Sequence, residues 1–436
     1  MSRREILRGC AVLTLDERRP LIEDGEIELD LDRGRLAYVG ARRPEPSAGV
    51  TDARGLLAMP GLVNAHTHAA MTLERGCGDG LPLAAWLQEV WKLERRATAA
   101  DIRAGLRLAM VEMIKAGTTA FADMYFYDEA LVGEVAGSGM RAALAFGLLP
   151  EVNLFQTAAG GLATLAETAD VAASCQGTGD GRVRTMLGPH APYTCSPAYL
   201  REVAEVAMAH DLPLHTHVSE TRREVEECRA RYGLSPVQLV GQCGVLDGHC
   251  LAAHCVHVDE SDIEILASKP NACVVHNPGS NLKLGSGIAP VPRMLAAGVR
   301  VALGTDGAAS NDNLDVFDEL SLAAILHRGA TEDAGAVSDW TALRMAAFEG
   351  GRALGFGDVG VLAEGFQADL ILISLAVPHL TPAHSLAGLV VHSAGGADVR
   401  SVYVAGRCLM RDRELLTLDE EAVLEEARLR AAALRS

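Results

Sequence analysis

The chain has 436 residues, a formal net charge of −18, 49% hydrophobic residues and 22% charged residues. This composition predicts a folded globular chain with a large core, and the acidic balance argues against nucleic acid or an anionic membrane as partner, because both require a basic surface. No apolar run reaches the roughly 18 residues of a membrane span, and the apolar stretch at 11–15 is too short for a signal-peptide core.

The ten cysteines are scattered and include no Cys-x-x-Cys pair. Secreted domains built on disulfides are shorter and denser in cysteine. We therefore expect free thiols in a reducing compartment, and a cytoplasmic protein.

The first 58 residues predict short β-strands. Apolar runs with β-branched or alternating residues occupy 6–15, 25–31 and 35–39, and turn sequences separate them. Residues 42–47 are rich in proline and predict a loop.

From residue 59 to about 356, apolar strand-like runs alternate with helix-like segments. The strand candidates are 61–65, 118–124, 140–148, 183–187, 212–217, 251–254, 272–276 and 299–305. Helical periodicity is clearest at 102–116, 197–210, 291–297 and 314–326. This alternation predicts a TIM-type (β/α)₈ barrel. A doubly wound sheet is the alternative, but no Gly-x-Gly-x-x-Gly follows the first strand.

After residue 357 the pattern turns back to strands, at 369–374, 388–391 and 401–405, and a helix at 419–434 closes the chain. Strand-rich segments on both sides of a barrel predict one small β-sandwich domain built from both termini. The expected domains are therefore 1–58 together with 357–436, and a catalytic barrel at 59–356.

Histidines at predicted strand ends are the strongest functional signal. His66 and His68 point to the same side of the first barrel strand, because residues i and i+2 do so in any strand. Two imidazoles on one side can share a cation such as Zn²⁺ or Fe²⁺. His215 and His217 share a face in the same way. We expect His217, nearer the rim, to be the third ligand and His215 to be a core histidine.

Three further polar residues lie at strand ends on the same rim. Asp306 lies between two glycines after the eighth strand, and we expect it to bind the metal and to accept a proton from water. Glu220 is placed to carry protons, although an acid at a helix N-terminus is the alternative. His254, after the sixth strand, is expected to polarise the bond under attack.

The rim predicts a single catalytic metal ion. The chain has only four lysines, and the fourth strand ends in Gly188-Pro189-His190, with no lysine to bridge two ions. Three histidines and one aspartate leave a coordination position open for water, as a hydrolytic site requires. Zinc is expected, and iron suits the same ligands.

These residues resemble the mononuclear deaminase branch of the amidohydrolase superfamily, and most closely the 5′-methylthioadenosine/S-adenosylhomocysteine deaminases. The matching runs are PGLVNAHTH (60–68), HVSE (217–220), AHCVH (253–257), GTDGAASN (304–311), FADMYF (121–126), GPHAPY (188–193) and HNPGSNLKLG (276–285). Triazine chlorohydrolases share most of these motifs, so the leaving group is less certain than the fold.

The resemblance implies hydrolytic release of ammonia from the 6-position of an adenine nucleoside. It assigns Glu220 to protonation of ring nitrogen N1 and Glu94 to the ribose hydroxyls. It places Trp86 near the 5′-substituent, and His190 and Ser310 in contact with the nucleoside. A surface acid on a helix is the alternative for Glu94, and structural hydrogen bonding is the alternative for His190 and Ser310.

One departure bears on the substrate. Some members that accept S-adenosylhomocysteine carry arginines for its carboxylate, and one such position is Phe146 here. The segment 151–168 contains no lysine or arginine. A carboxylate there would lack a strong partner, so we expect 5′-methylthioadenosine, 5′-deoxyadenosine or adenosine ahead of S-adenosylhomocysteine. Packing in the barrel is the alternative for Phe146.

Two rival functions remain. A chlorohydrolase, or a guanine- or cytosine-type deaminase, would use the same site, although Glu94 favours a substrate with a ribose. A non-catalytic scaffold would be expected to lose metal ligands, and none of the candidates is missing. Barrels of this kind often assemble, so a homo-oligomer is a further expectation.

Overall fold

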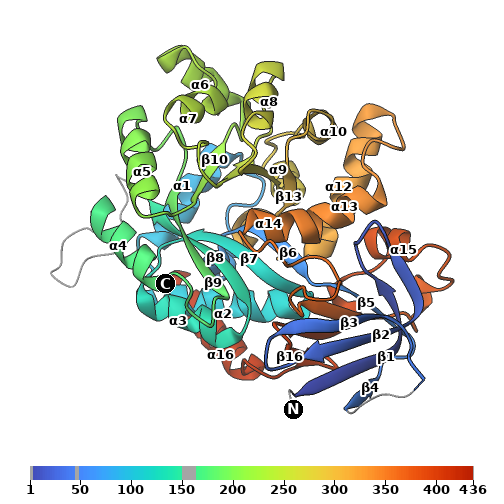
Figure 1. Ribbon diagram of the computed structural model, residues 1–436. Helices are drawn as coiled ribbons and strands as arrows, with labels where there is room; N and C mark the ends of the chain where they lie inside the picture. The colour runs from blue at the N-terminus through green and yellow to red at the C-terminus, as the bar shows by residue number, and fades with distance from the viewer. Residues whose placement is uncertain (1–2, 45–48, 150–163, 436) are drawn as a thin grey trace.

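The computed structural model describes residues 3–44, 49–149 and 164–435. A barrel surrounded by helices forms one part of the molecule, and a large sheet lies beside it (Figure 1). No helix in these residues is long and apolar enough to cross a bilayer.

Eight parallel strands form the barrel, and each pairs with the next along the chain. They are β6 (Leu62–Thr67), β7 (Thr118–Tyr125), β8 (Arg141–Leu148), β9 (Val183–Pro189), β10 (Leu214–Val218), β11 (Cys250–His254), β12 (Ala272–His276) and β13 (Val301–Leu303). After β13, the N–H of Asp306 donates to the carbonyl of His66 in β6 at 2.9 Å. The predicted (β/α)₈ barrel is confirmed, and the carboxyl ends of its strands form one rim.

Helices surround the barrel, and some of them lie at its rim. They are α1 (Leu83–Glu94), α2 (Ala99–Lys115), α3 (Glu129–Ser138), α4 (Leu165–Cys175), α5 (Pro197–Ala209), α6 (Arg222–Tyr232), α7 (Pro236–Gln242), α8 (Glu260–Ala267), α9 (Pro278–Lys283), α10 (Val291–Ala296), α11 (Ala308–Asn311), α12 (Val316–Thr331), α13 (Asp339–Arg344) and α14 (Gly350–Ala353). In α2, Thr98 and Asp101 form a capping box, and Gly117 follows the helix with φ +84°.

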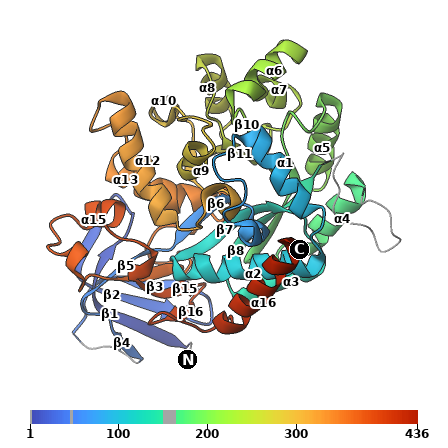
Figure 2. The same ribbon diagram turned by 180° about the vertical axis from the view of Figure 1, so that it is seen from behind.

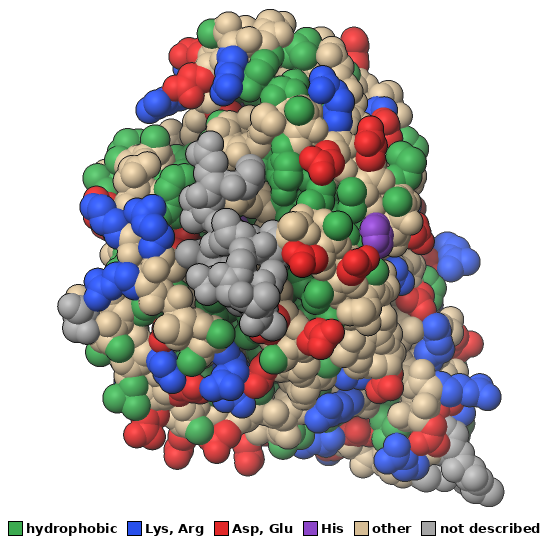
Figure 3. All heavy atoms as spheres, turned by 90° about the vertical axis from the view of Figure 1, so that its left-hand side faces the viewer, with side chains coloured by type: hydrophobic (Ala, Val, Ile, Leu, Met, Phe, Trp, Pro, Cys, Tyr) green, Lys and Arg blue, Asp and Glu red, His purple; other side chains and the backbone are tan. Residues whose placement is uncertain are grey.

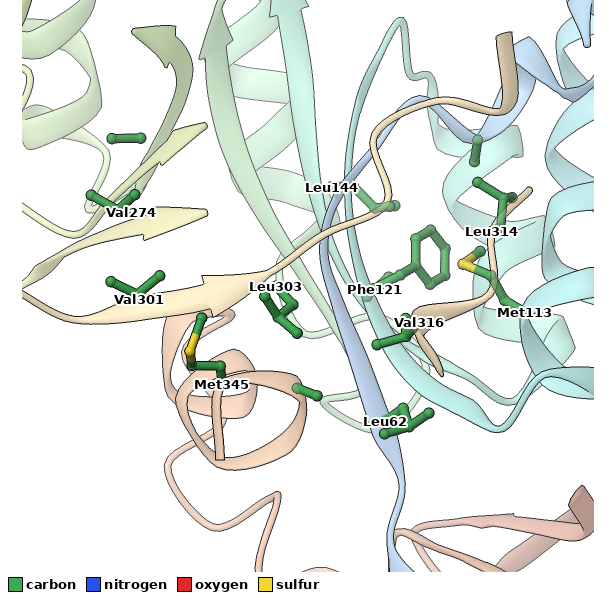
Figure 4. Close-up of a cluster of buried hydrophobic side chains, with 14 of the residues drawn as sticks. Leu62, Met113, Phe121, Leu144, Val274, Val301, Leu303, Leu314, Val316 and Met345 are labelled. Carbon is green, nitrogen blue, oxygen red and sulfur yellow. The ribbon is translucent and has the colours of Figure 1, made fainter. Parts of the chain in front are cut away.

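The barrel strands pack on two faces. Ala120 and Ala122 of β7 belong to the cluster inside the barrel, whereas Phe121 belongs to the larger cluster between strands and helices. In Figure 4, Phe121 lies beside Met113 of α2 and Leu314. Along this part of β7, small residues therefore face the interior, and the large Phe121 packs against the helices.

The two ends of the chain meet in a single mixed sheet. Its strands are β1 (Arg4–Leu13), β2 (Leu21–Asp30), β3 (Arg35–Ala41), β4 (Val50–Asp52), β5 (Leu56–Pro60), β14 (Leu370–Ser374), β15 (Val399–Val404), β16 (Arg407–Arg411) and β17 (Glu414–Leu415). The order is β17-β16-β15-β14-β5-β1-β2-β3, and β4 pairs with β1. Antiparallel pairing of β5 with β14 joins the two ends. The composite β part is confirmed, and its nine strands form one continuous sheet.

Two features near the C-terminus differ from or add to the sequence-based expectation. The predicted strand at 388–391 is wrong, because these residues lie in helix α15 (Leu386–His392), whose N-cap Ser385 accepts from the N–H of Gly388. The last helix, α16 (Glu420–Arg435), packs against α2 of the barrel (Figure 2), and Lys115 Nζ lies 2.8 Å from Glu420 Oε2. The domain limits 1–58, 59–356 and 357–436 stay a prediction.

A buried ion pair links the barrel to the sheet. Arg141 in β8 donates from Nε to Asp369 Oδ2 at 2.6 Å and from Nη2 to Oδ1 at 3.0 Å. Both side chains are almost completely buried, and Asp369 also accepts the N–H of Ala405. This pair fixes the two parts at the amino-terminal end of the barrel, away from the rim.

Asp369→Ala should lower the free energy of unfolding by roughly 3–5 kcal/mol, because it leaves the Arg141 guanidinium buried without its partner. The control is Asp32→Ala, which breaks the exposed pair with Arg3 and should cost less than about 1 kcal/mol. Chemical denaturation of both variants checks the difference. Equal unfolding midpoints would contradict it.

Candidate metal centre and the cavity around it

The four predicted metal ligands lie together at the carboxyl ends of three strands. His66 lies in β6 and His68 just after it, His217 lies in β10, and Asp306 follows β13. His68 Nε2 is 3.2 Å from His217 Nε2 and 3.4 Å from Asp306 Oδ1, and His66 Nε2 is also 3.4 Å from Asp306 Oδ1. We call these four residues the His₃Asp cluster. His254 lies close enough to His66 and His217 to form a second grouping with them.

Backbone carbonyls fix the imidazoles of His68 and His217. His68 Nδ1 lies 2.7 Å from the carbonyl oxygen of Met124, and His217 Nδ1 lies 2.8 Å from that of His190. A carbonyl only accepts, so each Nδ1 carries the proton, and each Nε2 presents a lone pair to the cluster. This is the tautomer that binds a metal.

His66 has a nitrogen that no group in the described residues satisfies. Its Nδ1 lies 2.8 Å from Nε2 of His215, while its Nε2 is buried without a hydrogen-bond partner. Burial lowers the pKa of His66 to about 4, so the ring is neutral near pH 7. A buried, unpaired acceptor is unfavourable, and a cation between His66 and Asp306 would satisfy it. His215 lies behind His66 as a core histidine, as the sequence predicts.

Asp306 is held as a carboxylate. Its Oδ2 accepts from Ser280 Oγ at 2.6 Å, and its Oδ1 accepts from the N–H of Gly307 at 2.8 Å. Burial alone would raise the pKa of Asp306, but the imidazoles of His66, His68 and His254 around its carboxylate hold that pKa well below its usual range. A Cβ at Gly304 would lie only 2.7 Å from the backbone nitrogen of His66, so this approach of the strands requires glycine.

Glu220 and His254 form a buried acid–base pair beside the cluster. Glu220 Oε2 lies 3.9 Å from His254 Nε2, and His254 Nδ1 lies 2.9 Å from Asn281 Oδ1. Burial raises the pKa of Glu220. Burial would lower the pKa of His254, but the charges of Glu220 and Asp306 outweigh it and raise that pKa. Both pKa values are therefore raised, and perturbed pKa values in neighbouring buried groups are typical of functional sites.

One cavity is lined by three members of the cluster, His68, His217 and Asp306, and by both residues of this pair. Among the described residues, its lining carries three carboxylates, Glu94, Glu220 and Asp306, and neither lysine nor arginine. Apolar side chains make up much of the remaining wall. They include Met71, Leu83, Leu87, Val90, Trp91, Phe126, Leu148, Leu149 and Leu284. The cavity therefore suits a small, largely apolar molecule that presents hydrogen-bond donors to acids.

Glu94 and Trp86 project from α1 into the cavity. The hydroxyl of Tyr125 donates to Glu94 Oε1 at 2.9 Å, and burial raises the pKa of Glu94. Trp86 Nε1 is buried without a hydrogen-bond partner in the described residues. Both side chains line the cavity, so a ligand bound there would contact them.

The other residues singled out in the sequence, His190, Ser310 and Phe146, have different surroundings. His190 lines the cavity, and its Nδ1 lies 2.9 Å from Thr194 Oγ1. Ser310 is not among the described lining residues, because it lies in α11 and its hydroxyl donates to the carbonyl of Gly307. Phe146 packs against Tyr127 with ring centroids 5.8 Å apart. This contact agrees with the alternative reading of Phe146 as a packing residue of the barrel. Most of the segment 151–168 falls outside the described residues.

Comparisons with known proteins agree with this geometry. The amidohydrolase family matches residues 57–409. The chain is 45% identical to a 5-methylthioadenosine/S-adenosylhomocysteine deaminase of Pelotomaculum thermopropionicum and 43% identical to a 5′-deoxyadenosine deaminase of Methanosarcina mazei, over 98% of each chain.

The chain belongs to the amidohydrolase family.

A solved structure extends this likeness to three dimensions. A zinc-bound adenosine deaminase from Xanthomonas campestris has 33% identity and a TM-score of 0.91, covering 99% of this chain and 98% of its own. The resemblance inferred from the motifs is thereby confirmed.

Several residues that position the site of this amidohydrolase escaped the sequence analysis. Ser280 and Asn281 of α9 hold Asp306 and His254, Tyr125 holds Glu94, and Asp123 accepts the N–H of Ala69 just after His68. All four residues lie in the matching runs at 121–126 and 276–285, but the spacing of residues within these runs does not show what each one binds. Their partners become visible only when the strands are brought together.

Ser280→Ala should weaken metal binding by about 10- to 100-fold, because groups that orient a ligand typically contribute that much to metal affinity. Competition against a chelator of known affinity measures it. The control is Ser268→Ala, which removes an exposed hydroxyl that donates to the carbonyl of Ile265 and should leave affinity unchanged. Equal affinities in the two variants would remove Ser280 from the site.

Proposed function

We propose that this amidohydrolase deaminates adenine nucleosides with a neutral 5′-substituent, releasing ammonia from the 6-position and leaving the inosine analogue. The observation that carries the proposal is the buried Glu220–His254 pair, 3.9 Å apart, beside the His₃Asp cluster in one cavity. The names of the relatives support the nucleoside, since each is a deaminase of an adenine nucleoside.

The residues of the His₃Asp cluster would hold one divalent cation. The unpaired Nε2 of His66, and the Nε2 lone pairs of His68 and His217, fit such an ion. A cation held there supplies Lewis acidity, which makes water a nucleophile near pH 7. We propose zinc over iron because the structurally similar adenosine deaminase binds zinc. We propose one ion because no lysine lines the cavity in the described residues.

The side chains around the substrate would manage its protons. Asp306, kept as a carboxylate, accepts a proton from the attacking water. Glu220 carries a proton and gives it to ring nitrogen N1 as the water oxygen adds to C6. His254 donates a hydrogen bond to that oxygen. The proton on Asp306 then passes to the amine, the C–N bond breaks, and ammonia leaves. The proton still on the added oxygen passes to the Glu220 carboxylate as the C6 carbonyl forms, which restores Glu220 to its starting state.

Contacts at the other end of the cavity would select the nucleoside. Glu94 accepts hydrogen bonds from the ribose hydroxyls, while Tyr125 occupies its other oxygen. Trp86 packs near the 5′-substituent, and His190, which follows β9, contacts the nucleoside. Ser310 is also proposed to contact the nucleoside, and its hydroxyl would first have to leave the carbonyl of Gly307, to which it donates.

The 5′-substituent is proposed to be neutral. The described lining contains no lysine or arginine, and the sequence has none from residue 142 to residue 181. The carboxylate of S-adenosylhomocysteine would therefore be desolvated without a cationic partner. A methylthio group or a simple methyl suits the apolar wall, so S-adenosylhomocysteine is proposed as a poorer substrate.

The setting proposed for the enzyme rests on separate observations. All ten cysteines are unpaired, which supports a reducing compartment such as the cytoplasm. On the face in Figure 3, acidic and basic described side chains are interspersed and form no continuous basic surface, which supports a small-molecule partner over nucleic acid. A homo-oligomer stays a proposal.

The metal-loaded enzyme should release ammonia from 5′-methylthioadenosine, 5′-deoxyadenosine and adenosine with kcat/KM at least about tenfold above that for S-adenosylhomocysteine. Free adenine should react poorly. Glu94→Gln should lower kcat/KM for the nucleosides by about 10- to 100-fold, because bonds to a charged group contribute about 1.5–3 kcal/mol. A coupled ammonia assay measures each rate.

Glu89→Gln is the matched control, since Glu89 lies on the same helix, is exposed and pairs with Lys92. It should retain the activity of the unmodified enzyme. Turnover of free bases alone, or chloride release from a chlorotriazine without ammonia release from any nucleoside, would contradict the proposed function.

A further inference from the structure

The turn after β10 changes which residues face the cavity. His217 in β10 lines the cavity, and so does Glu220 three residues later. In a continuing strand, residues an odd number apart point to opposite faces, and Glu220 would point away from His217. Ser219 instead adopts φ +54°. This left-handed residue turns the chain and returns Glu220 to the cavity.

A left-handed serine is unfavourable by about 1–3 kcal/mol, so neighbouring bonds must hold it. The N–H of Ser219 donates to Glu224 Oε1 at 3.0 Å, and its carbonyl accepts from the N–H of His257 at 2.9 Å. The N–H of Glu220 donates to Glu224 Oε2 at 2.7 Å. One buried carboxylate therefore binds two successive backbone donors, which requires two acceptor oxygens and no donor.

These bonds differ from ordinary helix capping. Glu224 is the third residue of α6, and its N–H donates to the side chain of the N-cap, Thr221, at 3.2 Å. The acid of a capping box bonds the backbone of the N-cap itself. The carboxylate of Glu224 also reaches Ser219 and Glu220, which precede the N-cap. Its bonds therefore hold the catalytic turn as well as the helix.

We propose that Glu224 is a positioning residue for proton transfer by Glu220. Glu224 is 5% exposed and is not among the described residues that line the cavity of the His₃Asp cluster. It acts by fixing the backbone of Glu220, so that the Glu220 carboxyl stays near His254 and accepts from Ser286 Oγ at 3.4 Å. This inference rests on the proposed function, because it requires that Glu220 transfers a proton.

A double-mutant cycle tests this inference. Glu224→Gln keeps the shape of the side chain but presents an NH₂ group to one of the two backbone donors. We expect kcat for 5′-methylthioadenosine to fall by about 10- to 100-fold, as expected for a misplaced catalytic group, with KM changed less than about threefold. In a Glu220→Gln background the same substitution should change kcat less than about twofold, because nothing is left to position.

Three measurements separate positioning from a general structural role. Glu227→Gln, on the same helix in an exposed pair with Arg223, is the control and should leave kcat unchanged. Bound metal should match the unmodified enzyme in every variant, and Glu224→Gln should lower Tm equally in the two backgrounds, because it loses the same buried hydrogen bond in both. Glu224→Asp, measured in both backgrounds, replaces Glu224→Gln if the latter does not fold.

The outcomes are distinguishable. An equal loss of kcat from Glu224→Gln in both backgrounds, or a loss matched by falling metal content, overturns the positioning role and leaves the proposed function intact. Full activity of Glu220→Gln alone overturns the role of Glu220 in the proposed function and the inference with it.

Discussion

The arrangement of the rim depends on lone pairs that converge at one buried point. His68 Nε2 lies 3.2 Å from His217 Nε2 and 3.4 Å from Asp306 Oδ1. His66 Nε2 is buried without a hydrogen-bond partner in the described residues. Acceptors do not stabilise each other in a dry interior. A cation at this point turns an unfavourable cluster into a binding site.

The fold serves this convergence in two ways. Parallel strands bring residues that are far apart in sequence to the same rim, and the N–H of Asp306 bonds the carbonyl of His66 where the barrel closes. Carbonyls of Met124 and His190 then fix the tautomers of the two histidines beside them. Left-handed residues, His254 at φ +73° and Asp306 at φ +62°, lie at the same rim. Such strain is stored where a site requires an unusual direction of a side chain.

Short-range periodicity explains what the sequence could predict. The i, i+2 spacing of His66 and His68 determines a shared face, and the choice of His217 over His215 follows from distance to the strand end. The prediction of a strand at 388–391 failed because two adjacent valines favour a strand locally, whereas the Ser385 cap and burial against the neighbouring elements stabilise a helix. The roles of Ser280, Asn281 and Glu224 were out of reach, because each depends on a partner from another strand end or on a turn that spacing does not reveal.

Metal content measured together with activity tests the central claim most directly. Elemental analysis should find one equivalent of divalent metal per chain in the active enzyme. Both metal and ammonia release should be lost in His68→Ala and retained in His210→Ala, whose imidazole pairs with exposed Asp170 far from the rim. Undiminished turnover by a chain freed of all divalent metal would contradict the account.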